Sequence, residues 1–202
     1  MRESGSVSNE QQRLIEALAT LIEDRGYSAT TVVDIVRVAS ASKRTFYQHF
    51  DNKQQCYLAL LQSRTAVLID RIRSEVDQEA HWHDQVRQMI EAYAAHLSSR
   101  PLVSLSWIRD LPALGLSARP TQRTNYTALT DVVRDMTTNP GFRRGGVPPV
   151  NRVKMVILLG GLRELAAQTV EDGGELRRAV EEATEIAIAI LQTPSGDGGH
   201  LR

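Results

Sequence analysis

A run of hydrogen-bond donors lies between Ser42 and His49, and it contains no acidic side chain. Its hydroxyl, ammonium, guanidinium, amide and imidazole groups come from Ser42, Lys43, Arg44, Thr45, Tyr47, Gln48 and His49. The first acid after the run is Asp51. Phosphate oxygens accept hydrogen bonds from such groups, and Arg, Lys, Gln and Thr also contact base edges in the major groove. The run therefore predicts a nucleic-acid-binding surface.

Two short helices are predicted to position these donors, at about 31–38 and 42–50, with the tight turn Ala39-Ser40-Ala41 between them. The apolar residues Ile35, Val36, Phe46 and Phe50 would fix the angle between the two helices. The N-terminus of the second helix adds free N–H groups and the positive end of its dipole. In a helix-turn-helix, this end of the second helix lies against the bases.

Two longer helices are expected to flank the pair. The first begins near Ser8, where Ser8-Asn9-Glu10-Gln11 fits a capping box, and ends before Gly26. The other follows Asp51 or Asn52, either of which can cap it. Four helices in about seventy residues predict a compact module.

The stretch TTVVDIVRVASASKRTFYQHFDNK, residues 30–53, resembles the signature of the TetR family, T-T-x-x-x-I-A-x-x-A-G-V-S-x-x-T-x-Y-x-H-F-x-x-K. Ten positions match: Thr30, Thr31, Ile35, Ala39, Ser42, Thr45, Tyr47, His49, Phe50 and Lys53. Within the turn, the chain departs from the signature at Ser40-Ala41, where the family has Gly-Val. A left-handed backbone at Ser40 would cost about 1 kcal/mol.

The resemblance implies roles for individual side chains. Thr31, Tyr47, His49 and Lys53 would contact phosphates. Lys43, Arg44 and Thr45 would face bases, with Ser42 beside them and Gln48 at the groove edge. It further implies a helix-turn-helix domain at 8–60, with the motif itself at 31–50, and a ligand-binding and dimerisation domain at 61–192. The segment LLGGLRELA near 158–166 also resembles a common family segment.

The rest of the chain shows helical spacing and no long alternating pattern, so the predicted fold class is all-α. Helices are expected at about 84–98, 102–110, 121–138, 150–171 and 175–192. Residues 139–149 (NPGFRRGGVPP) predict a loop, and residues 193–202 (TPSGDGGHLR) a disordered tail.

The last two of these helices are the candidate dimer interface. Glycine within a helix costs about 1 kcal/mol relative to alanine, and close approach of another helix usually offsets that cost. The candidate interface residues are Gly160, Gly161, Leu176, Val180, Ala183, Ala187 and Ile190. A four-helix contact between two copies would bury their apolar stripe; packing within one chain is the alternative.

Candidate effector contacts mix aromatic and polar groups on the middle helices, as ligand pockets do. They are Tyr93, His96, Trp107, Arg109, Tyr126 and Thr130. His81-Trp82-His83 lies at an expected turn between helices without a clear acidic or cysteine partner, so no metal is predicted. No cofactor is predicted either. Cys56 occupies an apolar position and predicts a buried residue, with a redox switch as the alternative.

Composition limits the function classes. Lys+Arg and Asp+Glu are both 24, so any DNA-binding surface must be a local basic patch. One cysteine, no signal-peptide pattern at Met1-Arg2-Glu3 and no apolar run of membrane-spanning length predict a cytoplasmic protein without a membrane partner. Phosphate-loop, H-E-x-x-H, G-x-S-x-G and Cys-x-x-Cys motifs are missing, so no enzyme is expected.

The sequence thus predicts a ligand-inducible repressor that binds double-stranded, palindromic operator DNA as a homodimer and responds to a small-molecule effector. The alternative is an interaction protein that keeps the fold and has lost DNA binding. Lys43 and Arg44, which stand clear of acids, argue against that alternative.

Overall fold

The computed structural model describes residues 3–193, and side chains from residue 9 onward. Every regular element within this range is helical, which confirms the predicted fold class. The elements are α1 (Glu3–Ala29), α2 (Val32–Val38), α3 (Lys43–His49), α4 (Lys53–Glu75), α5 (Trp82–Ser99), α6 (Pro101–Arg109), η1 (Leu111–Ala118, a 3-10 helix), α7 (Arg119–Met136), α8 (Pro140–Arg144), α9 (Arg152–Glu171), η2 (Leu176–Ala179, also 3-10) and α10 (Val180–Gln192). Apart from Thr193, the predicted tail lies outside the described residues.

The chain packs as two compact units. Unit 1 comprises Met1–Val67 and Arg100–Arg123, and unit 2 comprises Leu68–Ser99 and the residues from Thr124 onward. Helix α6 and the 3-10 helix η1 therefore pack with the N-terminal helices, although they follow α5 in sequence. The division into a helix-turn-helix domain at 8–60 and a ligand-binding and dimerisation domain at 61–192 stays a prediction about function.

The four N-terminal helices of unit 1 match the expected order, with one difference. Helix α1 begins at Glu3, so the start predicted near Ser8 is wrong. No proline precedes Ser8, and a capping pattern alone does not stop the backbone from continuing a helix. At the other end, Gly26 has φ 82° and interrupts the helix, as predicted. Asn52 Oδ1 accepts from the Gln55 N–H at 2.9 Å, which assigns the cap of α4 to Asn52.

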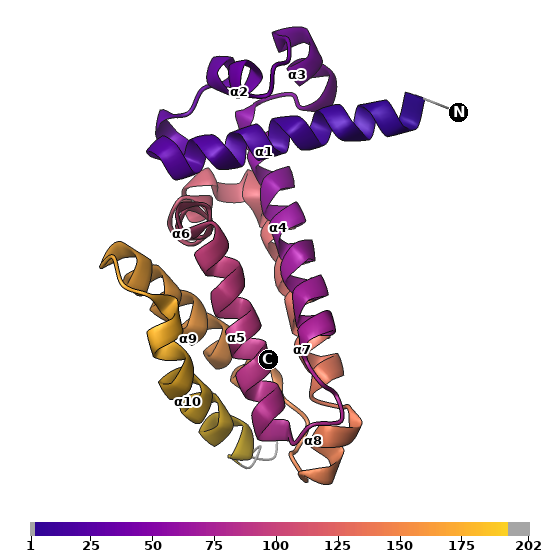
Figure 1. Ribbon diagram of the computed structural model, residues 1–202, viewed down its shortest axis with the longest axis vertical. Helices are drawn as coiled ribbons and strands as arrows, with labels where there is room; N and C mark the ends of the chain where they lie inside the picture. The colour runs from indigo at the N-terminus through magenta and orange to yellow at the C-terminus, as the bar shows by residue number, and fades with distance from the viewer. Residues whose placement is uncertain (1–2, 194–202) are drawn as a thin grey trace. The chain divides into compact units, whose positions relative to one another are not determined.

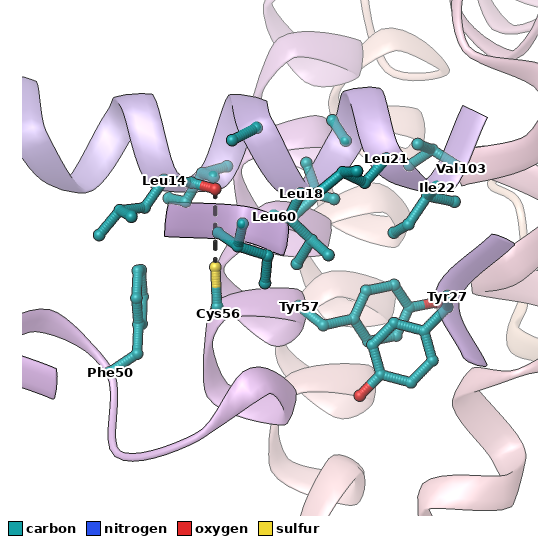
Figure 2. Packing of buried hydrophobic residues seen from close by; sticks show 14 of the residues in the cluster. Leu14, Leu18, Leu21, Ile22, Tyr27, Phe50, Cys56, Tyr57, Leu60 and Val103 are labelled. Carbon is teal, nitrogen blue, oxygen red and sulfur yellow. Dashed lines mark hydrogen bonds between the residues drawn. The ribbon is translucent and has the colours of Figure 1, made fainter. Parts of the chain in front are cut away.

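The core of unit 1 forms between α1, α2, α3, α4, α6 and η1. Figure 2 shows the part of this core around α1 and α4. Leu14, Leu18 and Ile22 lie one turn apart on α1 and are fully buried. Tyr57 of α4 stacks on Tyr27 with ring centroids 4.2 Å apart, and its hydroxyl lies 2.9 Å from Ser106 Oγ of α6. This core gives the short helices α2 and α3 a fixed base.

Unit 2 is built around α5, which packs against α10 and η2 (Figure 1). The loop predicted at 139–149 is partly wrong, because it contains α8. Pro140 occupies the first turn of α8, the Asn139 side chain accepts from the Phe142 N–H, and Phe142 is fully buried. The helix predicted at 175–192 is divided into η2 and α10. The turn at Asp172-Gly173-Gly174 is confirmed, and Gly173 has φ 67°.

Within the described part of the chain, no helix is both long and apolar enough to cross a membrane.

Candidate DNA-binding surface

Helices α2 and α3 each begin at a hydroxyl cap. Thr31 Oγ1 accepts from the Asp34 N–H at 3.2 Å, and Asp34 Oδ2 accepts from the Thr31 N–H at 3.0 Å, which completes a capping box. The Thr31 hydroxyl also donates to Asp34 Oδ2 at 2.7 Å, and this hydrogen bond, together with that from the Thr31 N–H, lowers the pKa of the Asp34 carboxyl. Ser42 Oγ accepts from the Thr45 N–H at 3.0 Å. Three of the predicted DNA contacts, Thr31, Ser42 and Thr45, therefore also fix the starts of the two helices.

The turn between α2 and α3 has a left-handed residue. Ser40 has φ 50° and is the only non-glycine residue with positive φ among those the structure describes. The Ala41 N–H donates to the Val36 carbonyl at 2.9 Å and closes the turn. Ser40 thus has a left-handed backbone at the position where the TetR-family signature has glycine.

Burial on one side of α3 decides which side faces solvent. Phe46 is fully buried, and the rings of Phe46 and Phe50 lie 5.7 Å apart. Lys43, Arg44, Tyr47 and Gln48 are exposed, and we call these four residues the basic face. The side chains of Lys43 and Arg44 form no ion pair or hydrogen bond with any described residue. The nearby Asp34 pairs instead with Arg25 and Arg37, at 3.6 and 3.2 Å.

His49 and Lys53 have partners within unit 1. The His49 side chain is only 8% exposed, and its Nε2 lies 3.6 Å from Glu10 Oε2 of α1. Lys53 Nζ donates to the Tyr27 and Thr30 carbonyls at 2.9 and 2.8 Å, and it lies 4.2 Å from the centre of the Tyr27 ring. Partial burial lowers the pKa of Lys53. The phosphate roles of both residues stay predictions.

Tertiary partners such as Glu10 and Tyr27 were not predicted from the sequence. Arg37 was also missed as a solvent-exposed cation at the end of α2, where its side chain is 66% exposed. The sequence did contain a signal for Arg37, since it lies three residues after Asp34 on a predicted helix, which is the spacing of an ion pair.

Cys56 of α4 is buried in the core of unit 1, and its Sγ lies 3.9 Å from the Leu14 carbonyl (Figure 2). Burial raises the pKa of the thiol to about 12. The buried position predicted from the sequence is confirmed. Since reactive cysteines have a lowered pKa and some exposure, this environment opposes a redox role.

The six predicted effector contacts are divided between the two units. Trp107 and Arg109 belong to unit 1, whereas Tyr93, His96, Tyr126 and Thr130 belong to unit 2. Tyr93 lines an apolar cavity of about 80 Å³ within unit 2. His96 is buried, Tyr126 is largely exposed, and the Thr130 hydroxyl donates to the Thr127 carbonyl at 2.8 Å. The cavity thus includes one of the six residues in its wall.

The seven predicted interface residues are also divided by burial. Leu176, Val180, Ala183 and Ala187 are buried within unit 2, three of them in one cluster with Val86 and Ile90 of α5. Packing within the chain, the alternative reading, therefore accounts for these four. Gly160 and Gly161 are exposed, and a Cβ added to either would meet no atom within 4 Å. Ile190 is half-buried.

The rings of His81 and His83 lie 4.8 Å apart. Among the described residues, no three His, Cys, Asp or Glu side chains are grouped so that they could hold a metal ion.

Comparison with known proteins finds a family match in the N-terminal helices. The profile of bacterial regulatory proteins of the tetR family matches residues 14–60, which include α2, the turn and α3. The chain is 32% identical over 81 residues to the HTH-type transcriptional activator FasR of Mycolicibacterium smegmatis, covering 40% of this chain and 37% of that protein. It is 34% identical over 80 residues to the HTH-type transcriptional repressor KstR2 of Mycobacterium tuberculosis, covering 40% of each. Residues 14–60 therefore belong to a domain of the tetR family of bacterial regulatory proteins.

These matches span less than half the length of the curated relatives. Solved structures extend the likeness in fold. The fatty acid degradation regulator FadR from Bacillus halodurans has a TM-score of 0.78 at 17% identity, covering 89% of this chain and 94% of that one. FadR from Bacillus subtilis, solved in complex with stearoyl-CoA, has a TM-score of 0.77 at 16% identity, covering 91% and 99%.

Proposed function

We propose that this chain is a sequence-specific DNA-binding regulator of transcription of the TetR family and that it acts as a repressor. The observation that carries the proposal is the basic face on α3. The side chains of Lys43 and Arg44, in the first turn of α3, have no partner among the described residues. Phe46 in the same helix is buried and fixes the position of α3 in unit 1. Such a turn suits base edges and phosphates in a major groove.

A homodimer is the second part of the proposal. Val153, Val156, Ile157, Gly160 and Gly161 repeat at helical spacing on α9, and all five are exposed. Ile186 of α10, which packs beside α9, is 53% exposed. We call these six residues the α9–α10 face. An apolar face of this kind supports contact with a second copy, and a two-fold dimer would match a palindromic operator.

The third part is induction by a small molecule bound in unit 2. In a dimer, a ligand can favour one spacing of the two α3 helices. It then changes the DNA affinity by the difference between its own affinities for the protein in that spacing and in the other. The cavity of about 80 Å³ in unit 2 supports a ligand site. The similar FadR fold, which was solved with stearoyl-CoA, shows that a protein of this architecture can hold a ligand.

Titration of the purified protein on DNA flanking its own gene tests DNA binding. Footprinting should show two half-sites about 34 Å apart or at a multiple of that distance. By fluorescence anisotropy, Arg44→Ala should weaken operator binding by ~1–3 kcal/mol and relax the preference at one base position in each half-site. Arg73→Ala, which removes an exposed arginine of unit 2, is the matched control and should leave affinity within about twofold.

Equal affinity of the unaltered protein for operator and scrambled DNA at two salt concentrations would exclude sequence-specific regulation. The sign of regulation needs a separate measurement. A reporter behind the bound promoter should rise when the gene is deleted; a fall would indicate an activator, as FasR is named.

A further inference from the structure

We infer that unit 2 binds a ligand with an aliphatic chain, whose chain lies in the cavity lined by α4, α5, α7, α9 and α10 and whose polar end lies in a groove beside η2. The inference deepens the proposed function and rests on it for its regulatory consequence. The binding itself is a property of unit 2 alone.

The chemistry of the wall selects an apolar ligand. Residues from α4, α5, α7, α9 and α10 line the cavity, and only Tyr93 and Thr137 among them are not purely apolar. The Thr137 hydroxyl donates to the Arg134 carbonyl at 3.0 Å, so this group already has its hydrogen bond. Burial raises the pKa of Tyr93, so its hydroxyl stays neutral. No charged side chain lines this space, and a polar group placed there would lose its hydration without compensation.

The size of the cavity favours a chain over a ring. Its volume of about 80 Å³ is roughly half that of an apolar cavity known to take benzene, ~150 Å³. A polymethylene chain is narrower than a ring and needs less displacement of the wall. Met89 and Met155 line the cavity, and methionine adapts to irregular shapes because it is unbranched and flexible. A few chain carbons fit without rearrangement, and more can enter as these side chains move.

Shared wall residues connect the cavity to a polar groove. Ile90, Tyr93 and Leu162 line both the cavity and a small pocket of about 20 Å³. Ala94 and Val180 line both that pocket and a groove of about 750 Å³. The small pocket therefore borders both the cavity and the groove within unit 2.

Both signs of charge line the groove. Its cations are Arg87 and Arg177, and its acids are Glu75, Glu91 and Glu181. Glu75 pairs with Arg71 at 2.7 Å. A ligand that extends from the cavity into the groove must be apolar at one end and polar at the other. Because neither sign predominates in the groove, the chain and not the head charge should dominate affinity.

Isothermal titration calorimetry on the full chain without DNA tests the inference. The probes are hexanoate, octanoate, decanoate and dodecanoate, each below its aggregation concentration. Each added methylene should lower Kd about fourfold until the cavity is filled, the factor that ~0.8 kcal/mol per buried methylene gives. Dodecan-1-ol and dodecylamine should bind within about tenfold of dodecanoate.

Two alanine variants on α10 locate the chain. Ala187 lines the cavity, so Ala187→Leu fills it and should weaken dodecanoate binding at least tenfold. Ala189 is exposed on the same helix, so Ala189→Leu is the control and should stay within twofold. Tyr93→Phe should also stay within about threefold, because the chain does not need the hydroxyl. Circular dichroism melting checks that each variant is folded.

The inference is overturned if no chain binds the unaltered protein, if Kd is independent of chain length, or if a folded Ala187→Leu binds as the parent does. Loss of binding in Tyr93→Phe would also overturn it, since recognition would then depend on a polar group. Failure of the proposed function is distinct. If the protein binds aliphatic chains and no DNA, this inference holds and the proposed regulatory role is wrong. If it binds DNA and no chain, the regulatory role can hold and this inference is wrong.

Discussion

Ser40 holds a left-handed backbone at the centre of the helix-turn-helix. An L-residue in this region costs roughly 1–2 kcal/mol, whereas glycine adopts it freely. Ser40→Gly should therefore raise the free energy of unfolding by about 1 kcal/mol, as measured by urea denaturation. Ser63→Gly is the matched control within α4, where φ is helical; it should lower stability by about 0.5 kcal/mol. Equal shifts of one sign would contradict the assignment of strain to Ser40.

Lys53 has a structural task that its motif position does not reveal. Its ammonium donates to two carbonyls, of Tyr27 and Thr30, close to the end of α1. Lys53→Met keeps the stem and removes both hydrogen bonds, so the free energy of unfolding should fall by about 1–2 kcal/mol. Lys43→Met, on the exposed basic face, should change it by less than about 0.5 kcal/mol.

DNA binding by the Lys53 variant must be measured well below its melting temperature, so that unfolding does not imitate a lost phosphate contact. An unchanged melting temperature in Lys53→Met would show that the two carbonyl contacts contribute little. A flatter salt dependence by about one charge per subunit would support an additional phosphate contact.

Among the helices, α6 depends on a cap supplied by another element. Its own N-cap residue, Arg100, makes no capping hydrogen bond through its side chain. Glu23 of α1 supplies the acceptor: its Oε1 accepts from the Val103 N–H at 2.8 Å, and its Oε2 lies 3.4 Å from the Leu102 N–H. A carboxylate at this end also meets the positive end of the helix dipole. The arrangement ties α6 to α1 within unit 1.

Glu23→Ala should consequently lower the free energy of unfolding by about 1 kcal/mol, in the range of a lost N-cap. Glu23→Gln keeps an acceptor and should recover about half of the loss. Asp24→Ala, which removes the exposed neighbouring acid, should have almost no effect. If Asp24→Ala proved as destabilising as Glu23→Ala, general surface charge and not capping would be responsible.

At the scale of the whole molecule, the α9–α10 face should hold two copies together. Ile157 is 53% exposed in the single chain, so Ile157→Glu should leave the monomer folded and bury a charge only in a dimer. Sedimentation velocity at micromolar concentration should show a dimer for the unaltered chain and at least a tenfold weaker association for Ile157→Glu. Leu116→Glu, at another exposed apolar residue, is the control.

Gly161→Leu extends this test, since the single chain has open space where the new side chain begins. Weaker association would then come from overpacking against the partner. A monomeric unaltered protein would contradict the proposed interface and, with it, the palindromic operator.

Sequence alone determined the features that depend on residues three or four positions apart. Thr31 with Asp34 and Ser42 with Thr45 set the starts of α2 and α3 through their own local hydrogen bonds. Gly26 and Gly173 mark turns because positive φ is easiest for glycine. Part of the basic face follows from the same locality, since Arg44 and Gln48 lie four residues apart on the side of the short helix opposite the buried Phe46.

Only the tertiary structure decided which partner satisfies a group that local spacing leaves open. The stripe through Val180, Ala183 and Ala187 could pack against a second copy or against α5, and the contacts show α5. Helix α8 depends likewise on distant residues: the Gly141 N–H donates to the Gln78 carbonyl at 3.2 Å, and a Cβ at Gly141 would collide with Gln85. Periodicity tells which side of a helix is apolar, but contacts between residues far apart in sequence tell what covers it.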